Sequence, residues 1–166
     1  MRAKRFAVVL TAIILLTGCT ITEKSEDESL KEYRKYFGES AIKLQKSLEY
    51  EKKGKEFLDT RDFDKAIEYF EKRKDLLVES KSLIQKAYDG VEDEELKEYA
   101  YLNIKQIEYL ILIEESRING IRYLKKSDIN MSKLYLKKFQ EYSKKAEEIN
   151  KIRGELHQKL KEEGKL

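Results

Sequence analysis

Few side chains in this sequence can do covalent or metal chemistry. The 166-residue chain has one cysteine, Cys19, and one histidine, His157. A histidine triad or a multi-histidine metal site needs partners that the chain lacks. The Glu-x-x-His pairs of helical di-metal sites are also missing, since Gly154 stands three positions before His157. The seven glycines are scattered and form no phosphate loop. We therefore predict no catalytic residue, no metal and no cofactor, and we expect His157 on the surface.

Acidic residues gather in three short clusters, at 26–28, 92–95 and 147–148. At the start of a helix such residues interact favourably with the helix dipole, and elsewhere they face water beside lysines. A weak cation site at 92–95 is the alternative interpretation. We favour the helix start.

The cysteine follows a segment with the layout of a secretory signal peptide. Three basic residues within the first five positions precede the apolar run Phe6–Leu16, and Thr17 and Gly18 complete the segment. The run has eleven residues, whereas a helix needs about 20 apolar residues to cross a bilayer. A plain secretory signal with a chance cysteine, or an uncleaved anchor, are the alternatives.

The residues Leu16-Thr17-Gly18-Cys19 resemble the lipobox of prokaryotic lipoproteins. This resemblance implies that a diacylglycerol is attached to the Cys19 sulfur and that the signal is cleaved between Gly18 and Cys19. Each buried methylene contributes roughly 0.8 kcal/mol, so two or three acyl chains anchor a protein firmly. The resemblance predicts a lipid-anchored protein at the cell membrane that faces outside the cytoplasm.

The charge of the chain gives no support for a nucleic-acid partner. The formal net charge is +3, and residues 1–18 contain three basic and no acidic residues. The rest of the chain therefore holds 32 basic and 32 acidic residues, which are interleaved in the sequence. A nucleic-acid footprint requires a basic excess on one face. We predict no nucleic-acid binding.

The remaining residues predict an all-α domain. Residues 19–29 form a polar tether, and residues 30–166 form a single domain without proline that is rich in Lys, Glu and Leu. Turn residues at 59–64, 88–95 and 125–130 divide it into four long helices, at 27–59, 62–88, 93–126 and 129–162. Short connections make neighbouring helices antiparallel.

Apolar patterns predict which helix faces lie in the core. The last helix carries a stripe with spacings of mostly three and four: Leu134, Leu136, Phe139, Tyr142, Ala146, Ile149, Ile152, Leu156 and Leu160. The third helix is apolar on more than one side, because Ile111, Leu112 and Ile113 are consecutive. Such a helix is usually buried by several neighbours, so we expect it at the centre. An exposed apolar strip that awaits a partner is the alternative.

Two segments repeat with an offset of 66 residues. Lys53–Lys72 and Asn119–Lys138 align without gaps, and each contains a helix end, a turn and the next helix start. Identical or similar pairs include Gly54/Gly120, Phe57/Tyr123, Ala66/Ser132 and Phe70/Leu136. Such internal repetition is typical of stacked helical hairpins.

The first copy resembles a tetratricopeptide repeat. Gly54, Phe57, Ala66 and Phe70 stand at that family's spacings, and Gly120, Tyr123, Ser132 and Leu136 match in the second copy. The resemblance implies hairpin geometry at 47–80 and 113–146, with these residues as packing positions. The family's later alanine is replaced by Arg73 and Phe139, and its closing proline is missing. A four-helix bundle is therefore the alternative to a hairpin stack.

These features predict a membrane-anchored interaction module without enzymatic activity, whose protein partner the sequence does not name. A structural spacer of the cell envelope is the alternative. A groove lined by Tyr99, Tyr101 and Tyr109 would favour binding, whereas an evenly charged surface would favour the spacer.

Overall fold

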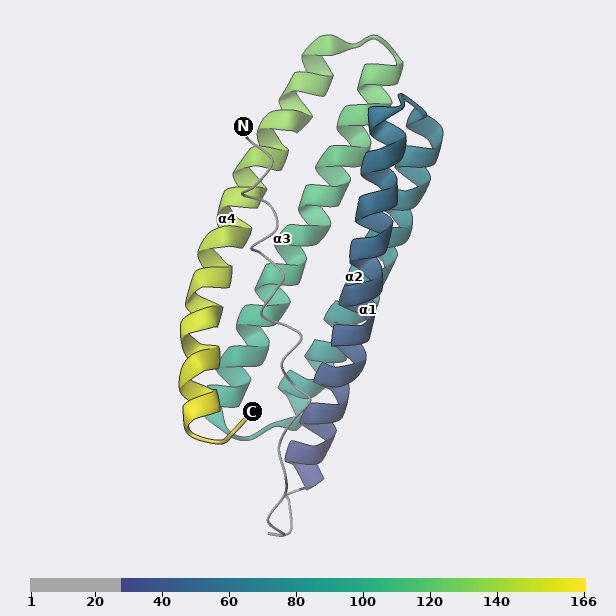
Figure 1. Ribbon diagram of the computed structural model, residues 1–166. Coiled ribbons are helices and arrows are strands. Elements are labelled where there is room, and N and C mark those ends of the chain that lie inside the picture. Colours follow the sequence, from purple (N-terminus) through teal and green to yellow (C-terminus); the bar gives the residue numbers. More distant parts are fainter. Residues whose placement is uncertain (1–27) are drawn as a thin grey trace.

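The computed structural model describes residues 28–166, which form an all-α domain of four long helices (Figure 1). They are α1 (Glu28–Asp59), α2 (Phe63–Gly90), α3 (Glu94–Lys125) and α4 (Ile129–Glu162). The predicted fold class is confirmed, and each predicted helix boundary lies within two residues of the observed one. The predicted signal peptide, Gly18 and Cys19 lie outside the described residues.

Aspartate side chains start three of the helices. Asp62, Asp93 and Asp128 are the N-caps of α2, α3 and α4, and each accepts hydrogen bonds from backbone N–H groups in the first turn. These N–H groups have no partner within the helix, which is why a capping oxygen stabilises a helix start. Asp62, Asp93 and Asp128 were the positions that the sequence pattern indicated.

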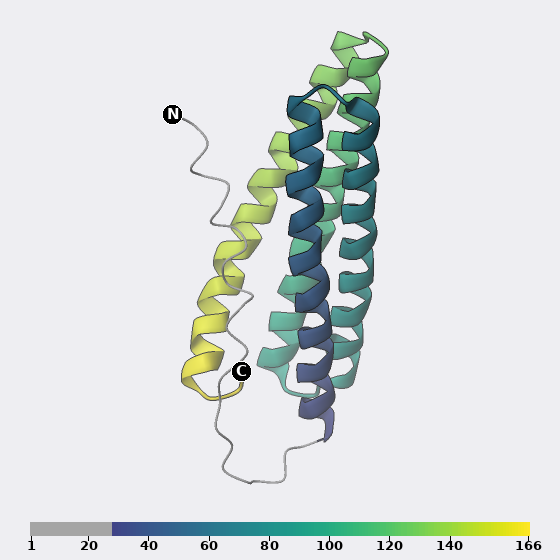
Figure 2. The ribbon, with the colours of Figure 1, turned by 45° about the vertical axis from the view of Figure 1, so that its right-hand side comes forward.

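Consecutive helices run antiparallel and pack against each other (Figure 1). The α1–α2 and α3–α4 turns lie at one end of the molecule. The start of α1, the α2–α3 connection and the end of α4 lie at the other end. The 34 residues of α4 correspond to roughly 50 Å. The α3–α4 turn projects beyond the α1–α2 turn, and the C-terminal half of α4 diverges from α1 (Figure 2).

Helix α3 is the central helix, as its all-round apolar pattern predicted. Fourteen of its 32 residues are buried, against six in α1, seven in α2 and three in α4. The main core joins residues from all four helices, including Phe37, Leu77, Ile107 and Leu160. A helix with neighbours on several sides must be apolar on several sides, which explains its pattern.

The predicted apolar stripe of α4 is wrong in part. Ala146 and Leu160 are buried, but Leu134, Leu136 and Ile152 are exposed. Helix α4 packs extensively on α3 alone, so only a narrow strip of its surface is covered. Spacings of three and four identified residues near one face without showing how wide the contact would be.

Within residues 28–166, none of the helices is long and apolar enough to cross a membrane.

Candidate functional site

The turn between α1 and α2 has a tightly defined geometry. The Asp62 amide donates to the Phe57 carbonyl (2.9 Å), and the Arg61 amide donates to the Leu58 carbonyl (3.0 Å). Arg61 has a φ of 61°, which places it in the left-handed region. These bonds form the Schellman motif that satisfies the last carbonyls of a helix. Because Asp62 also caps α2, one residue ends one helix and begins the next.

The α3–α4 turn repeats this geometry 66 residues later. The Asp128 amide donates to the Tyr123 carbonyl (2.9 Å), and the Ser127 amide donates to the Leu124 carbonyl (2.9 Å). Ser127 has a φ of 61°, like Arg61. Asp128 caps α4 through the Met131 amide. The two turns therefore have the same backbone structure.

Stacked aromatic rings flank both turns at equivalent positions. The rings of Phe57 and Tyr69 stack at 5.4 Å, and those of Tyr123 and Tyr135 stack at 5.5 Å. In both copies, the lysine three residues after the second ring lies over that ring. The 66-residue repeat thus extends from sequence to three-dimensional structure in these hairpins.

Beneath the first turn, the repeat residues form a small apolar core. Ala66 and Phe70 are fully buried, and the Phe70 ring lies against the buried backbone of Gly54. Ile118 and Ile121 of α3 complete this core. Phe57, Leu58, Phe63 and Ile67 are partly buried against it.

The second copy lacks this cover. Leu136, the counterpart of Phe70, is 56% exposed, so the prediction that it packs like Phe70 is wrong. Leu124 and Ile129, the counterparts of Leu58 and Phe63, are 39% and 48% exposed. Tyr123, Ser132 and Gly120 are partly buried. The C-terminal part of α3 covers the first copy, whereas no described helix covers Leu124, Ile129 and Leu136. We call these three residues the open face.

The two copies also differ in charge. Residues 122–138 contain six basic residues and one acidic residue, whereas residues 56–72 contain three basic and six acidic residues. Counting charge over the whole chain hid this separation, although a count over short windows would have found it. Two ion pairs join the copies: Arg122 contacts Glu71 at 2.6 Å, and Lys125 contacts Asp64.

A buried cluster of four charges links α1, α2 and α3. Arg73 is bonded to Glu114 and lies 2.8 Å from Glu51. Arg117 donates to both oxygens of Glu114, at 3.0 and 2.9 Å, and lies over the Phe70 ring. The Glu114 side chain is fully buried. Sequence analysis noted Arg73 only as a departure from the repeat pattern, because a buried arginine and an exposed arginine look alike in a charged sequence.

A small cavity lies between α1, α3 and α4, near the end where α1 begins. Its lining includes Tyr33, Phe37, Tyr99, His157 and Leu166. The cavity volume is about 30 Å³. Ligand pockets have volumes of roughly 300–1,000 Å³, whereas a site for one water molecule needs about 10–15 Å³. This cavity therefore has room for water but not for an organic ligand.

The prediction that His157 is a surface residue is wrong. His157 is partly buried, and its Nδ1 lies 3.0 Å from the Tyr99 hydroxyl. Burial lowers the pKa of His157, and the positive charges of Arg153 and Lys161 lower it further. The side chain is therefore neutral at physiological pH, and it joins α4 to α3.

A polar group beside the cavity also joins α3 and α4. The buried Arg153 donates to Asn103 at 3.0 Å and to Asn150 at 2.8 Å. Gln106 donates to the same Asn150 oxygen. Every one of these side chains makes contacts inside the protein, so the group acts in packing. The sequence around Arg153 has no pattern that distinguishes it from exposed charged segments.

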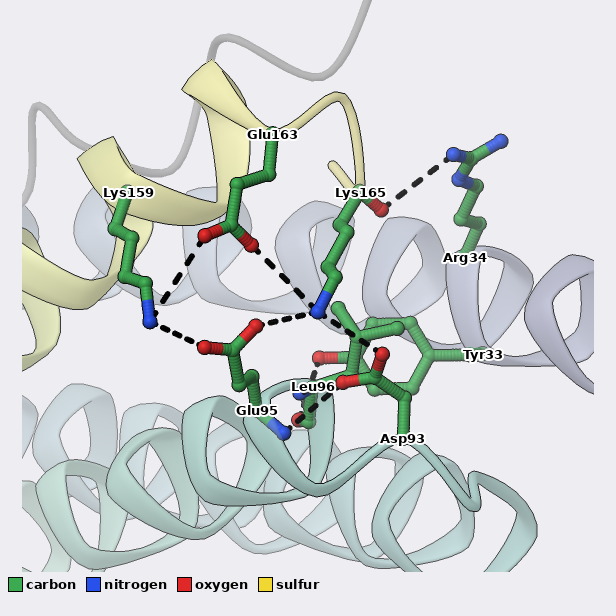
Figure 3. A network of polar contacts seen from close by, with 8 residues as sticks. All are labelled: Tyr33, Arg34, Asp93, Glu95, Leu96, Lys159, Glu163 and Lys165. Carbon is green, nitrogen blue, oxygen red and sulfur yellow. Dashed lines mark hydrogen bonds and ion pairs between the residues drawn. The ribbon is translucent and has the colours of Figure 1, made fainter.

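At the same end, the residues that follow α4 are fastened to the start of α3 (Figure 3). The Lys165 ammonium binds Glu95 and lies 3.1 Å from Asp93, while Lys159 also binds Glu95. Hydrogen bonds from Lys159 and Lys165 lower the pKa of Glu95 to about 2. The cluster at 92–95 is thus a helix start and a partner for lysines.

The three tyrosines proposed as a groove do not line one surface. Tyr99 is buried, Tyr101 is exposed and Tyr109 is partly buried, with its ring 6.5 Å from that of Tyr142. Among residues 28–166, no group of three histidine, cysteine or carboxylate side chains could hold a metal ion.

No protein-family model, curated protein or solved structure matches this chain.

Proposed function

We propose that this chain is the precursor of a lipoprotein that displays an all-helical protein-interaction domain on the outer side of a cell membrane. The observation that carries the interaction role is the open face, with three exposed aliphatic side chains in a basic segment. A solvent-exposed apolar cluster with a charged rim is typical of a protein-binding surface. We propose no enzymatic activity and no nucleic-acid partner.

The lipid anchor is supported by the residues that end the apolar N-terminal run. Leu16, Thr17 and Gly18 precede Cys19, as in a lipobox. After cleavage, the chain from Cys19 to the start of α1 at Glu28 would reach at most about 30 Å. The end of the domain where α1 begins would then face the membrane, and the open face lies at the opposite end.

A binding role for a small molecule has less support. The described cavity has room only for water, and the polar side chains around it already bond to each other. A non-catalytic spacer is the second candidate, because the domain is a rod whose longest helix spans roughly 50 Å. A spacer, however, has no need for exposed leucine and isoleucine at its far end.

The anchor is tested with Cys19→Ala in cells, with Thr20→Ala as the matched control. We expect Cys19→Ala to remain uncleaved or to leave the membrane fraction, and Thr20→Ala to behave as the wild type. Mass spectrometry of the wild-type N-terminal peptide should show an acylated Cys19. A bare thiol in material from cells would contradict the anchor.

The interaction role is tested by photo-crosslinking in cells, with the photoreactive residue at one exposed position per variant. Ile42, Val78, Leu136 and Ile152 give positions on three helices. A discrete crosslinked protein at any of them supports an interaction module. Monomeric protein at all four positions would favour the spacer.

A further inference from the structure

The internal repeat shows what kind of structure covers an equivalent surface. In the first copy, Ile118 and Ile121 lie three residues apart on α3 and pack on Ala66 and Phe70. From this relationship we propose that the open face binds an amphipathic helix of a partner protein, with two aliphatic side chains three residues apart and an acidic flank. This inference rests on the proposed interaction role, and it names the surface and the partner's chemistry.

The apolar part of the argument follows from exposure. The repeat places Leu124, Ile129 and Leu136 where Leu58, Phe63 and Phe70 lie in the first copy, around the same turn. The first set is covered by a helix and the second is exposed. A helix in that position would remove three aliphatic side chains from water, which is favourable by about 25 cal/mol per Å² of apolar surface.

The charge requirement follows from the ion pairs of the first copy. There, Glu71 binds Arg122 of the covering helix. The counterpart of Glu71 is Lys137, and Lys133 lies one helical turn before it. Within the described part of the chain, neither lysine forms an ion pair, and both are exposed. A covering helix must therefore bring carboxylates where α3 brings Arg122.

The same charges argue against a second copy of this chain as the partner. The segment that fits a repeat surface is the C-terminal part of α3, which carries Arg117, Arg122 and Lys125. Placed against Lys133 and Lys137, these residues would bring like charges together, which disfavours association. Stacking of copies onto the open face is thus unfavourable, and an acidic helix is favoured.

Two synthetic peptides test the proposal, each held helical by a side-chain staple. The acidic peptide has the sequence of residues 112–127 with Arg117, Arg122, Lys125 and Lys126 replaced by glutamate, and the control peptide keeps these residues. Binding to the membrane-extracted full protein in mild detergent is measured by fluorescence anisotropy. We expect the acidic peptide to bind at least about tenfold more tightly, with affinity that falls as salt rises.

Matched variants locate the binding surface. Leu136→Ser should weaken the acidic peptide by about tenfold, whereas Ile152→Ser, at an equally exposed leucine-like position on α4, should leave the affinity unchanged. The double variant Lys133→Glu and Lys137→Glu should reverse the preference between the peptides. Both leucine-like positions are exposed, and melting temperatures confirm that the variants fold.

Several results would overturn the proposal. Equal affinity of the two peptides, or no binding of either up to about 1 mM, which corresponds to roughly −4 kcal/mol, would do so. Self-association that Leu136→Ser abolishes would assign the open face to a second copy. Binding of anionic lipid vesicles that depends on Leu136 would assign it to a membrane. Crosslinking to a protein at Ile42 or Val78 in cells, without peptide binding, would leave the interaction role intact and reject this surface.

Discussion

The ring of Phe70 lies directly against the backbone of Gly54. A Cβ atom at residue 54 would come within 2.5 Å of ring atom Cε1, closer than side chains tolerate. At Gly120, 66 residues later, the nearest atom to a Cβ would be the Cβ of Tyr135 at 3.5 Å, an ordinary contact. The two glycines of the repeat are therefore equivalent in sequence but not in packing.

Alanine at these glycines should have opposite effects on stability. Overpacking costs about 1–3 kcal/mol, whereas alanine in place of a helical glycine contributes roughly 1 kcal/mol. We expect Gly54→Ala to lower the free energy of unfolding and Gly120→Ala to raise it slightly, as measured by urea denaturation. Equal shifts in the same direction would contradict the packing described for Phe70.

The buried pair of Arg73 and Glu114 should be strongly coupled. Removing one partner leaves a charge without compensation, so Arg73→Met should destabilise the protein by about 3–5 kcal/mol. The double variant Arg73→Met and Glu114→Leu removes one charge of each sign, and it should cost clearly less than the sum of the two single changes. A double-mutant cycle measures this coupling.

The exposed pair of Lys72 and Glu68 serves as a control for that cycle, since both side chains are about half exposed. Its coupling should be below about 1 kcal/mol. If both cycles gave equally small values, the buried cluster would not bind its charges as the geometry indicates.

Acid should release the contacts between Lys165 and the start of α3. The pKa of Glu95 is about 2 in the folded protein, below its ordinary value of 4.5. The ion pairs of Glu95 therefore stabilise the fold fully above pH 4.5, and this stabilisation is lost as the pH falls from 4.5 towards 2. The amide NMR signals of Gly164 and Lys165 should titrate in this range, and Glu95→Gln should abolish the titration. Signals that titrate unchanged in Glu95→Gln would exclude Glu95 as the cause.

His157 should make stability depend on pH near neutrality. Its pKa in the folded protein is below the ordinary 6.5, so the unfolded chain binds a proton first as the pH falls. The stabilisation is complete above pH 6.5 and decreases below it. Melting temperatures of the wild type should fall from pH 7.5 to pH 5.5 more than those of His157→Gln. Because the chain has one histidine, parallel curves would mean that His157 is not held neutral.

The sequence alone predicted the helices because local signals define them. Asp62, Asp93 and Asp128 have side chains that cap a helix start in any context, and the missing proline removes the main helix breaker. The central place of α3 was predictable for a related reason, since a helix that is apolar all round needs several neighbours. The 66-residue offset likewise located both turns.

Tertiary structure decided which equivalent residues are covered. Phe70 and Leu136 occupy the same repeat position, yet one is buried beneath α3 and the other is exposed, because only the first hairpin has a following helix. Likewise, Arg73, Arg153 and His157 are buried or partly buried by helices distant in the sequence. Local sequence determines whether a residue is helical, whereas burial depends on which segment from elsewhere in the chain lies beside it.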